Sequence, residues 1–155
     1  MKGWDRGTSD NHDGARSSLV PKGWTHRLSS SLVLPEICME MLPPRIVREQ
    51  LTRSELVRIA SDQFGDMVKA VVDVERGIMA LGGELHSDEE AVLLDDGSSQ
   101  SNLWGINLYP SADEADWVEY DSMINVRPSQ GNRTRGVEDA ALRGKIRRIV
   151  NELVK

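Results

Sequence analysis

The chain lacks the features of a disulfide-linked, zinc-binding or membrane-spanning protein. Its single cysteine, Cys38, excludes an intramolecular disulfide and a zinc site built from several cysteines. Its apolar runs are far shorter than the roughly 20 residues that a membrane-spanning helix needs. The N-terminus also lacks the apolar core of a secretory signal. These absences predict a soluble cytoplasmic protein with no membrane partner.

Positive charge is scarce as well. The 155 residues include 19 Lys and Arg against 25 Asp and Glu, which gives a net charge of −6. A protein that binds nucleic acid broadly needs a basic surface, because its affinity depends on releasing counterions from phosphates. The composition therefore makes broad nucleic-acid binding a poor fit, although a local site for a small anion is compatible with it.

The first 44 residues differ from the rest in pattern. They show no sustained helical or alternating apolar period, and Pro43 and Pro44 disfavour helix where they end. We predict that residues 1–44 are a disordered tail. Two alternatives stay open: translation starting naturally at Met39 or Met41, and a functional N-terminal arm. Within this part, SLVLPEI could form one short strand or dock on the core.

From residue 45 onward, apolar periods predict alternating strands and helices. The expected strands lie at 46–50, 67–74, 78–85, 103–109 and 117–127, and the expected helices at 52–64, 87–94 and 139–153. The order β-α-β-β-α-β-β-α predicts a single α+β domain over residues 45–155. We expect a largely antiparallel sheet with the helices packed on it.

Two of the expected helices begin with a capping box, in which a hydroxyl and a carboxylate three residues apart satisfy free backbone N–H groups. Thr52 and Glu55 form the first, and Ser87 and Glu90 the second. Gly97 suits the end of the second helix, because glycine readily adopts the left-handed conformation found there.

Strand periodicity predicts that several polar residues share one side of the sheet. Side chains two residues apart in a strand point the same way. If the polar faces of three predicted strands coincide, they form one polar strip made of Glu84, His86, Asn107, Asn125 and Arg127.

His86 is the candidate catalytic residue of this strip, with Glu84 beside it. A histidine near a carboxylate can serve as acid or base near neutral pH. The alternative is a histidine that is hydrogen-bonded locally and takes no part in catalysis. Glu84, His86 and Asp88 also form an E-x-H-x-D string, but acidic residues commonly occupy a first helical turn, so we predict no metal site.

The stretch RPSQGNRTR is the candidate ligand-binding loop. Arginine pairs with carboxylate or phosphate through two parallel hydrogen bonds, and amide side chains orient a ligand. The candidate residues are Arg127, Gln130, Asn132, Arg133 and Arg135, with Asn107 and Asn125 from the strip. The alternative is that Arg127 and Arg133 pair internally with carboxylates such as Asp73 or Glu119.

No nucleotide fingerprint, phosphate loop or zinc motif is present, so we predict no cofactor. Three functions stay open: a binding module for an anionic or phosphate-bearing ligand at the loop, a protein that binds a protein partner or itself, and a small phosphodiester-cleaving enzyme that uses His86. The binding module is the preferred hypothesis.

Two long strings, FGDMVKAVVDVERGIMALGGELHSDEEAVLLDDGSSQSNLWGINLYP and SMINVRPSQGNRTRGVED, resemble a known family. It is a small family of archaeal and bacterial proteins known only as a domain of unknown function. The resemblance covers about residues 46–155 and implies a compact single domain preceded by an extension. It implies no activity, because no catalytic residues are established for the family.

Overall fold

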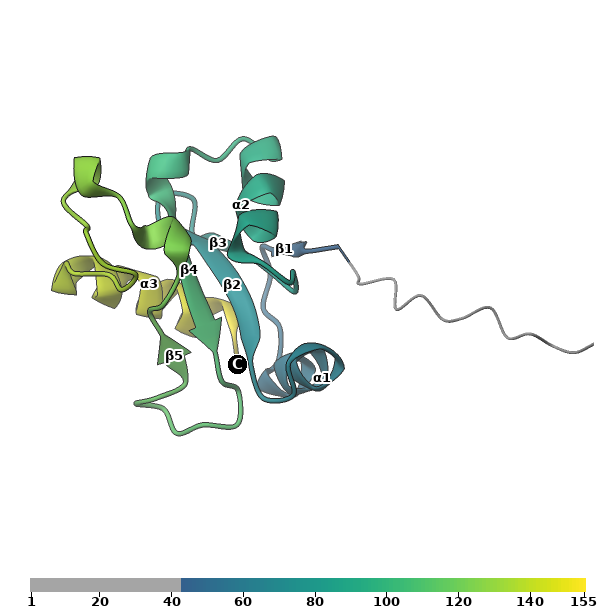
Figure 1. The fold of residues 1–155 in the computed structure, drawn as a ribbon. Coiled ribbons are helices and arrows are strands. Elements are labelled where there is room, and N and C mark those ends of the chain that lie inside the picture. Colours follow the sequence, from purple (N-terminus) through teal and green to yellow (C-terminus); the bar gives the residue numbers. More distant parts are fainter. Residues whose placement is uncertain (1–42) are drawn as a thin grey trace, which may run out of the picture. The chain divides into compact units, whose positions relative to one another are not determined.

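A computed structural model describes residues 43–155. Residues 1–42 lie outside the described residues, and so do the disordered tail and the alternative starts predicted for them. The described part forms one α+β domain, as expected (Figure 1).

A five-stranded antiparallel sheet is the centre of the domain. Its strands run in the order β1-β3-β2-β4-β5. Their bounds are β1 Arg45–Val47, β2 Val68–Asp73, β3 Ile78–Leu81, β4 Leu103–Leu108 and β5 Val118–Glu119. The helices are α1 Arg53–Gln63, α2 His86–Asp95 and α3 Ala140–Leu153. The predicted fold class and largely antiparallel sheet are therefore confirmed.

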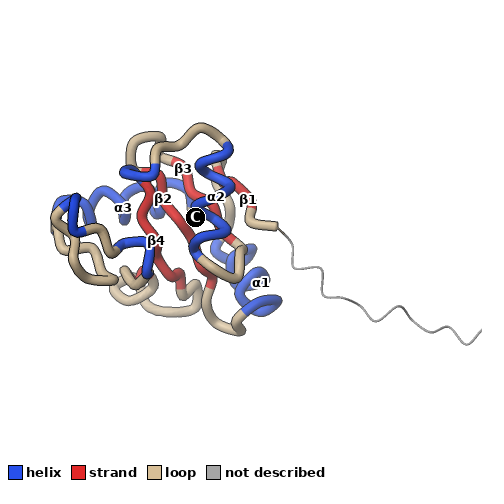
Figure 2. Tube along the Cα trace, turned by 45° about the horizontal axis from the view of Figure 1, so that its top comes forward, coloured by secondary structure: helices blue, strands red, loops and turns tan. Residues whose placement is uncertain are grey.

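The helices cover both faces of the sheet (Figures 1 and 2). The larger apolar cluster includes Leu56 of α1 and Ile146 of α3, packed against one face. The smaller cluster places Leu93 of α2 against Val71 and Leu103 on the opposite face. Because both faces are covered, almost every residue of the three central strands is buried.

One of the two predicted capping boxes forms. The Thr52–Glu55 capping box of α1 is confirmed. At α3, which had no predicted capping box, Asp139 accepts the N–H groups of Ala141 and Leu142. The box predicted for Ser87 and Glu90 is wrong, because the cap residue of α2 is Leu85, two positions before Ser87, and the helix begins at His86. There Asp88, rather than Glu90, accepts the backbone N–H of Leu85, at 3.1 Å.

The strand predicted for residues 117–127 is also wrong beyond its first residues. β5 comprises only Val118 and Glu119, and two short 3-10 helices follow, at Met123–Asn125 and Pro128–Gln130. The Ser122 hydroxyl accepts the N–H of Ile124 and starts the first of them. This local hydrogen bond replaces the pairing that a continuing strand would make with β4.

The predicted strand 78–85 ends early as well. β3 stops at Leu81, because Gly82 adopts a positive φ of 96°. The peptide between Gly82 and Gly83 is then bonded from both faces of the sheet. Gln63 of α1 donates to the Gly82 carbonyl, and Glu89 of α2 accepts the Gly83 N–H. One peptide group therefore ties the two helices to the sheet.

Within residues 43–155, no helix has the length and apolar character needed to cross a membrane.

Candidate functional site

The site is built along β4, beginning with a buried asparagine. Asn125 is completely buried, and its side chain accepts the Gly105 N–H at 2.8 Å and donates to the Gly105 carbonyl at 2.9 Å. A third bond joins it to the Arg135 carbonyl. Asn125 thus supplies hydrogen-bond partners to the backbone of β4 beyond the end of β5. Gly105 has to be glycine, because a Cβ there would lie 2.5 Å from Ser122.

His86 lies beside Ile106, the residue of β4 that follows Gly105. Its Nε2 is 2.8 Å from the Ile106 carbonyl, an acceptor only, so Nε2 carries a proton. In the neutral ring the other nitrogen, Nδ1, is then the free base. Burial lowers the pKa of His86 from its ordinary value, while the bond to Ile106 and the Asn107 side chain act in the opposite direction.

Arg127 lies beside Trp104, the residue of β4 that comes before Gly105. Its guanidinium is 5.2 Å from the centre of the Trp104 ring. His86, Asn125 and Arg127 therefore lie beside three consecutive residues of β4, whereas the predicted polar strip also included Glu84 and Asn107 and required a continuous strand. Asn125 and Arg127 reach these positions from the 3-10 segment, and the expected strand does not form. Glu84 is exposed beside Lys69, whose Nζ donates to the Glu84 carbonyl.

The Arg127 guanidinium is held mainly by neutral acceptors. Nε donates to the Ile124 carbonyl, and Nη1 to the Gln100 carbonyl and to Gln130 Oε1. Nη2 is 3.4 Å from Glu90 Oε1, and the two side chains are 11% and 13% exposed. Burial lowers the pKa of Arg127 from its ordinary value, and the Glu90 carboxylate partly opposes this. The internal pairing considered for Arg127 exists, with Glu90 as its partner.

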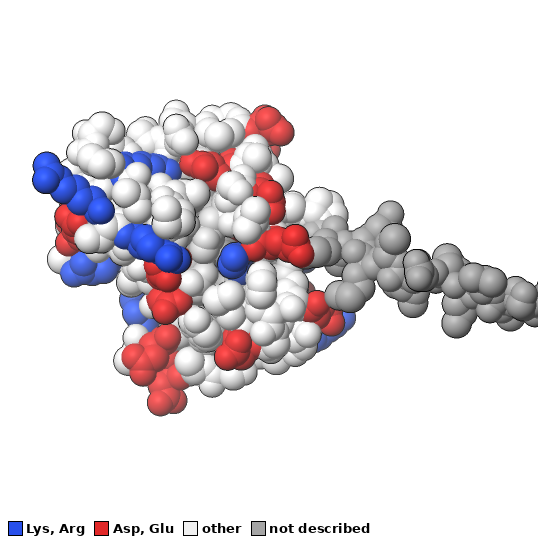
Figure 3. Space-filling model, in the orientation of Figure 1, with Lys and Arg blue, Asp and Glu red and all other residues white. Residues whose placement is uncertain are grey.

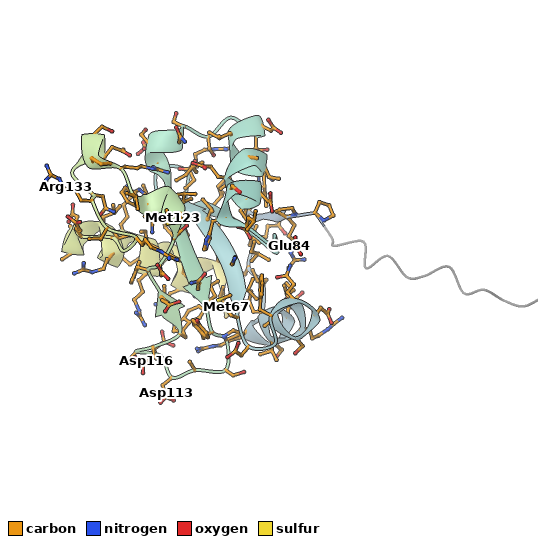
Figure 4. All side chains as sticks on the ribbon, in the orientation of Figure 1. Met67, Glu84, Asp113, Asp116, Met123 and Arg133 are labelled. Carbon is orange, nitrogen blue, oxygen red and sulfur yellow. The ribbon has the colours of Figure 1, made fainter. Side chains whose placement is uncertain are left out.

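Arg127 and Gln130 line an open pocket of about 590 Å³ beside α2. The other lining residues come from α2, from the short helix Gln100–Asn102 and from the 123–130 segment: Glu90, Gln100, Ser101, Met123, Ile124, Val126, Pro128 and Ser129. Met123, one of these lining residues, is 67% exposed. Its position over the sheet is visible in Figure 4.

The remaining loop residues lie outside this pocket. Asn132 is buried and bonds to backbone groups of the loop, including the Gly136 carbonyl at 2.7 Å. Arg135 forms a two-pronged pair with Asp121. Arg133 is exposed and points away from the domain at the outer end of the loop (Figure 4), with no side-chain hydrogen bond to the described residues. The three arginines of the loop therefore do not converge.

A second group of polar side chains surrounds Asn107 at the far end of β4. Its amide nitrogen donates to Glu119 Oε2 at 2.8 Å, and the Tyr109 hydroxyl donates to the same oxygen at 3.2 Å. Asn107 is 7% exposed, and its carbonyl oxygen has no hydrogen-bond partner among the described residues. Lys69 is the residue directly across from Asn107 on β2.

One face of the domain shows no extended basic surface. On the face drawn in Figure 3, basic side chains alternate with acidic ones, and no continuous basic surface forms. No three potential ligands among His, Cys, Asp and Glu of residues 43–155 lie close enough to hold a metal ion.

The sequence did not indicate that Glu90 lines the pocket and pairs with Arg127. It assigned Glu90 to a helix cap, whereas the structure places it against Arg127. Helical spacing could have suggested a functional face, because His86 and Glu90 are four residues apart and lie on the same side of α2. No local pattern indicated that Gln100 and Ser101 line the pocket.

Comparison with known proteins adds a family. A family model described as "Protein of unknown function (DUF5674)" matches residues 45–153, which contain every helix and strand of the structure. Searches of the curated proteins and of the solved structures found no match. The chain therefore belongs to the DUF5674 family of proteins of unknown function.

Proposed function

We propose that the chain is a binding module that holds an anionic ligand in the Arg127 pocket. One observation carries the proposal: a guanidinium lines a pocket of about 590 Å³ and is tied to its carboxylate partner by a single contact of 3.4 Å. Pockets of roughly 300 to 1,000 Å³ are typical of small-molecule sites.

The weak link to Glu90 makes the guanidinium available. Charge-assisted hydrogen bonds between guanidinium and carboxylate usually measure roughly 2.7 to 2.9 Å. The contact between Arg127 and Glu90 is longer, and the three contacts to carbonyl oxygens bring no negative charge. An anion that enters the pocket therefore competes only with Glu90.

A cytoplasmic location belongs to the same proposal, because the single cysteine rules out an intramolecular disulfide.

Thermal unfolding of the full chain against a panel of small anions tests the proposal. A ligand at about 100 times its dissociation constant stabilises the folded state by roughly 2.7 kcal/mol, which raises the midpoint by several degrees. We expect Arg127→Lys to remove most of the shift, because lysine keeps the charge but loses the planar guanidinium that Ile124, Gln100 and Gln130 hold in place.

Arg133→Gln is the matched control, since Arg133 is a loop arginine outside the pocket. It should leave the shift intact. A flat panel would contradict the proposal, and so would a shift that disappears in Arg133→Gln and persists in Arg127→Lys.

The geometry of His86 favours a second candidate function, phosphodiester cleavage. Its bond to Ile106 leaves Nδ1 as the free base of the neutral ring, and its lowered pKa keeps that base unprotonated at neutral pH. A bell-shaped rate profile that His86→Asn abolishes would support this function. Lack of turnover with RNA, nucleotides and simple phosphodiesters would rule it out.

A further inference from the structure

Few of the Arg127 donors remain for a ligand. A guanidinium has five N–H groups. Nε and Nη1 supply three of them, and all three are used by oxygens of Ile124, Gln100 and Gln130. Only the two N–H groups of Nη2 are left, and Glu90 is their sole acceptor among the described residues. A ligand therefore meets one nitrogen of the arginine.

The charge of the pocket is also small. Arg127 is the only cation among its lining residues, and Glu90 is an anion in the same wall. A phosphate monoester carries a charge of roughly −1.5 to −2 at neutral pH and has three acceptor oxygens. Neither the charge nor the donors of the pocket match such a group. A carboxylate carries a single charge, and the Glu90 carboxylate already occupies this position.

The remaining walls are partly apolar. Met123, Ile124, Val126 and Pro128 line the pocket, and Met123 and Val126 are 67% and 38% exposed. Covering these side chains with an apolar ligand would remove their surface from water, which is favourable in proportion to the area buried. A small polar anion such as acetate would leave them exposed.

From the free donors, the charge and the apolar walls of the pocket, we infer that the ligand is a monocarboxylate with an apolar body. The inference rests on the proposed function. The ligand carboxylate replaces Glu90 at Nη2 of Arg127, and its apolar part covers Met123 and Val126. Glu90 acts as an internal competitor that occupies the arginine while the pocket is empty.

Matched pairs of probes test this class with the full chain. Benzoate and phenyl phosphate share a ring, hexanoate and hexyl phosphate share a chain, and acetate lacks an apolar body. We expect benzoate and hexanoate to bind at least about tenfold more tightly than their phosphate counterparts and than acetate, a difference of about 1.4 kcal/mol. Isothermal titration calorimetry measures each affinity directly.

Glu90→Gln tests the competitor. Glutamine keeps an oxygen for Nη2 but removes the negative charge, so benzoate should bind several-fold more tightly and the preference over phenyl phosphate should narrow. Glu152→Gln is the control, because Glu152 is exposed on α3 and does not line the pocket. Unchanged benzoate affinity in Glu90→Gln would refute the competitor role.

The outcomes separate this inference from the proposed function. Tighter binding of the phosphates would overturn the ligand class while leaving the proposed function intact. Equal binding of acetate and benzoate would overturn the apolar body. Failure of all five probes, together with a flat response to the wider anion panel, would overturn both proposals.

Discussion

Glu89 of α2 holds the Gly83 N–H with a carboxyl group that lies inside the protein. Its side chain is completely buried, and Oε1 accepts that N–H at 2.8 Å. Its other oxygen has no partner among the described residues. Burial raises the pKa of Glu89 from 4.5 to about 8. We predict that Glu89→Gln changes how stability depends on pH, because glutamine keeps the acceptor but cannot ionise.

The sign follows from proton linkage. As pH rises, the unfolded chain loses the Glu89 proton near its ordinary pKa of 4.5, whereas the folded chain keeps it to about pH 8. The wild type is therefore progressively destabilised across that window, by about 1.36 kcal/mol per pH unit. Between about pH 5.5 and about pH 7.5, the variant should gain roughly 2.7 kcal/mol relative to the wild type.

Urea unfolding at the two pH values measures this difference. Other groups titrate in both proteins and cancel when the wild type is subtracted from the variant. Glu152→Gln, at an exposed position of α3, should follow the wild type. Parallel pH profiles for Glu89→Gln and the wild type would refute the reasoning, since they would mean that Glu89 ionises in the folded protein as it does in the unfolded chain.

Three further substitutions or titrations have defined outcomes. Asn125→Leu removes three hydrogen bonds and leaves both backbone groups of Gly105 without their partner. The free energy of unfolding in urea should therefore fall by about 3 kcal/mol. A fall of under about 1 kcal/mol would contradict the role of Asn125. Gly105→Ala places a Cβ 2.5 Å from Ser122 and should lower the melting temperature at a cost of about 1 to 3 kcal/mol. His86 should titrate by NMR with a midpoint below 6.5, because burial lowers its pKa. The stability that neutral His86 contributes should be lost as the pH falls from 6.5 through that midpoint. A midpoint above 6.5 would contradict this expectation.

Much of the fold could be predicted because its signals are local. The Thr52–Glu55 box and the apolar period of α3 depend on residues within a few positions of one another, and both were confirmed. The 117–127 segment shows why alternation alone is insufficient. Its alternation is that of a strand, but the Asn125 side chain bonds to β4 in place of the backbone. That contact joins residues 20 positions apart and leaves no local pattern.

The candidate site could be predicted only in part for the same reason. The loop composition singled out a segment that contains the pocket residues Arg127 and Gln130. It could not show that Arg133 points outward, or that Glu90 of α2, 37 positions away in the sequence, faces Arg127. Residue type alone does not distinguish an arginine that is free for a ligand from one that is already bonded within the protein.

The Asn125 amide has a consequence for how the protein behaves at high concentration. An uncovered sheet edge is a template onto which another chain can add a strand, and proteins protect such edges to avoid aggregation. The Asn125 side chain offers Gly105 one acceptor and one donor and no further groups along the edge. A backbone strand would instead present a new row of free N–H and C=O groups on its outer side. A chain that added at this point would first have to displace a completely buried side chain. Asn125 therefore terminates the sheet here as well as supporting it, and its loss should promote assembly as well as unfolding.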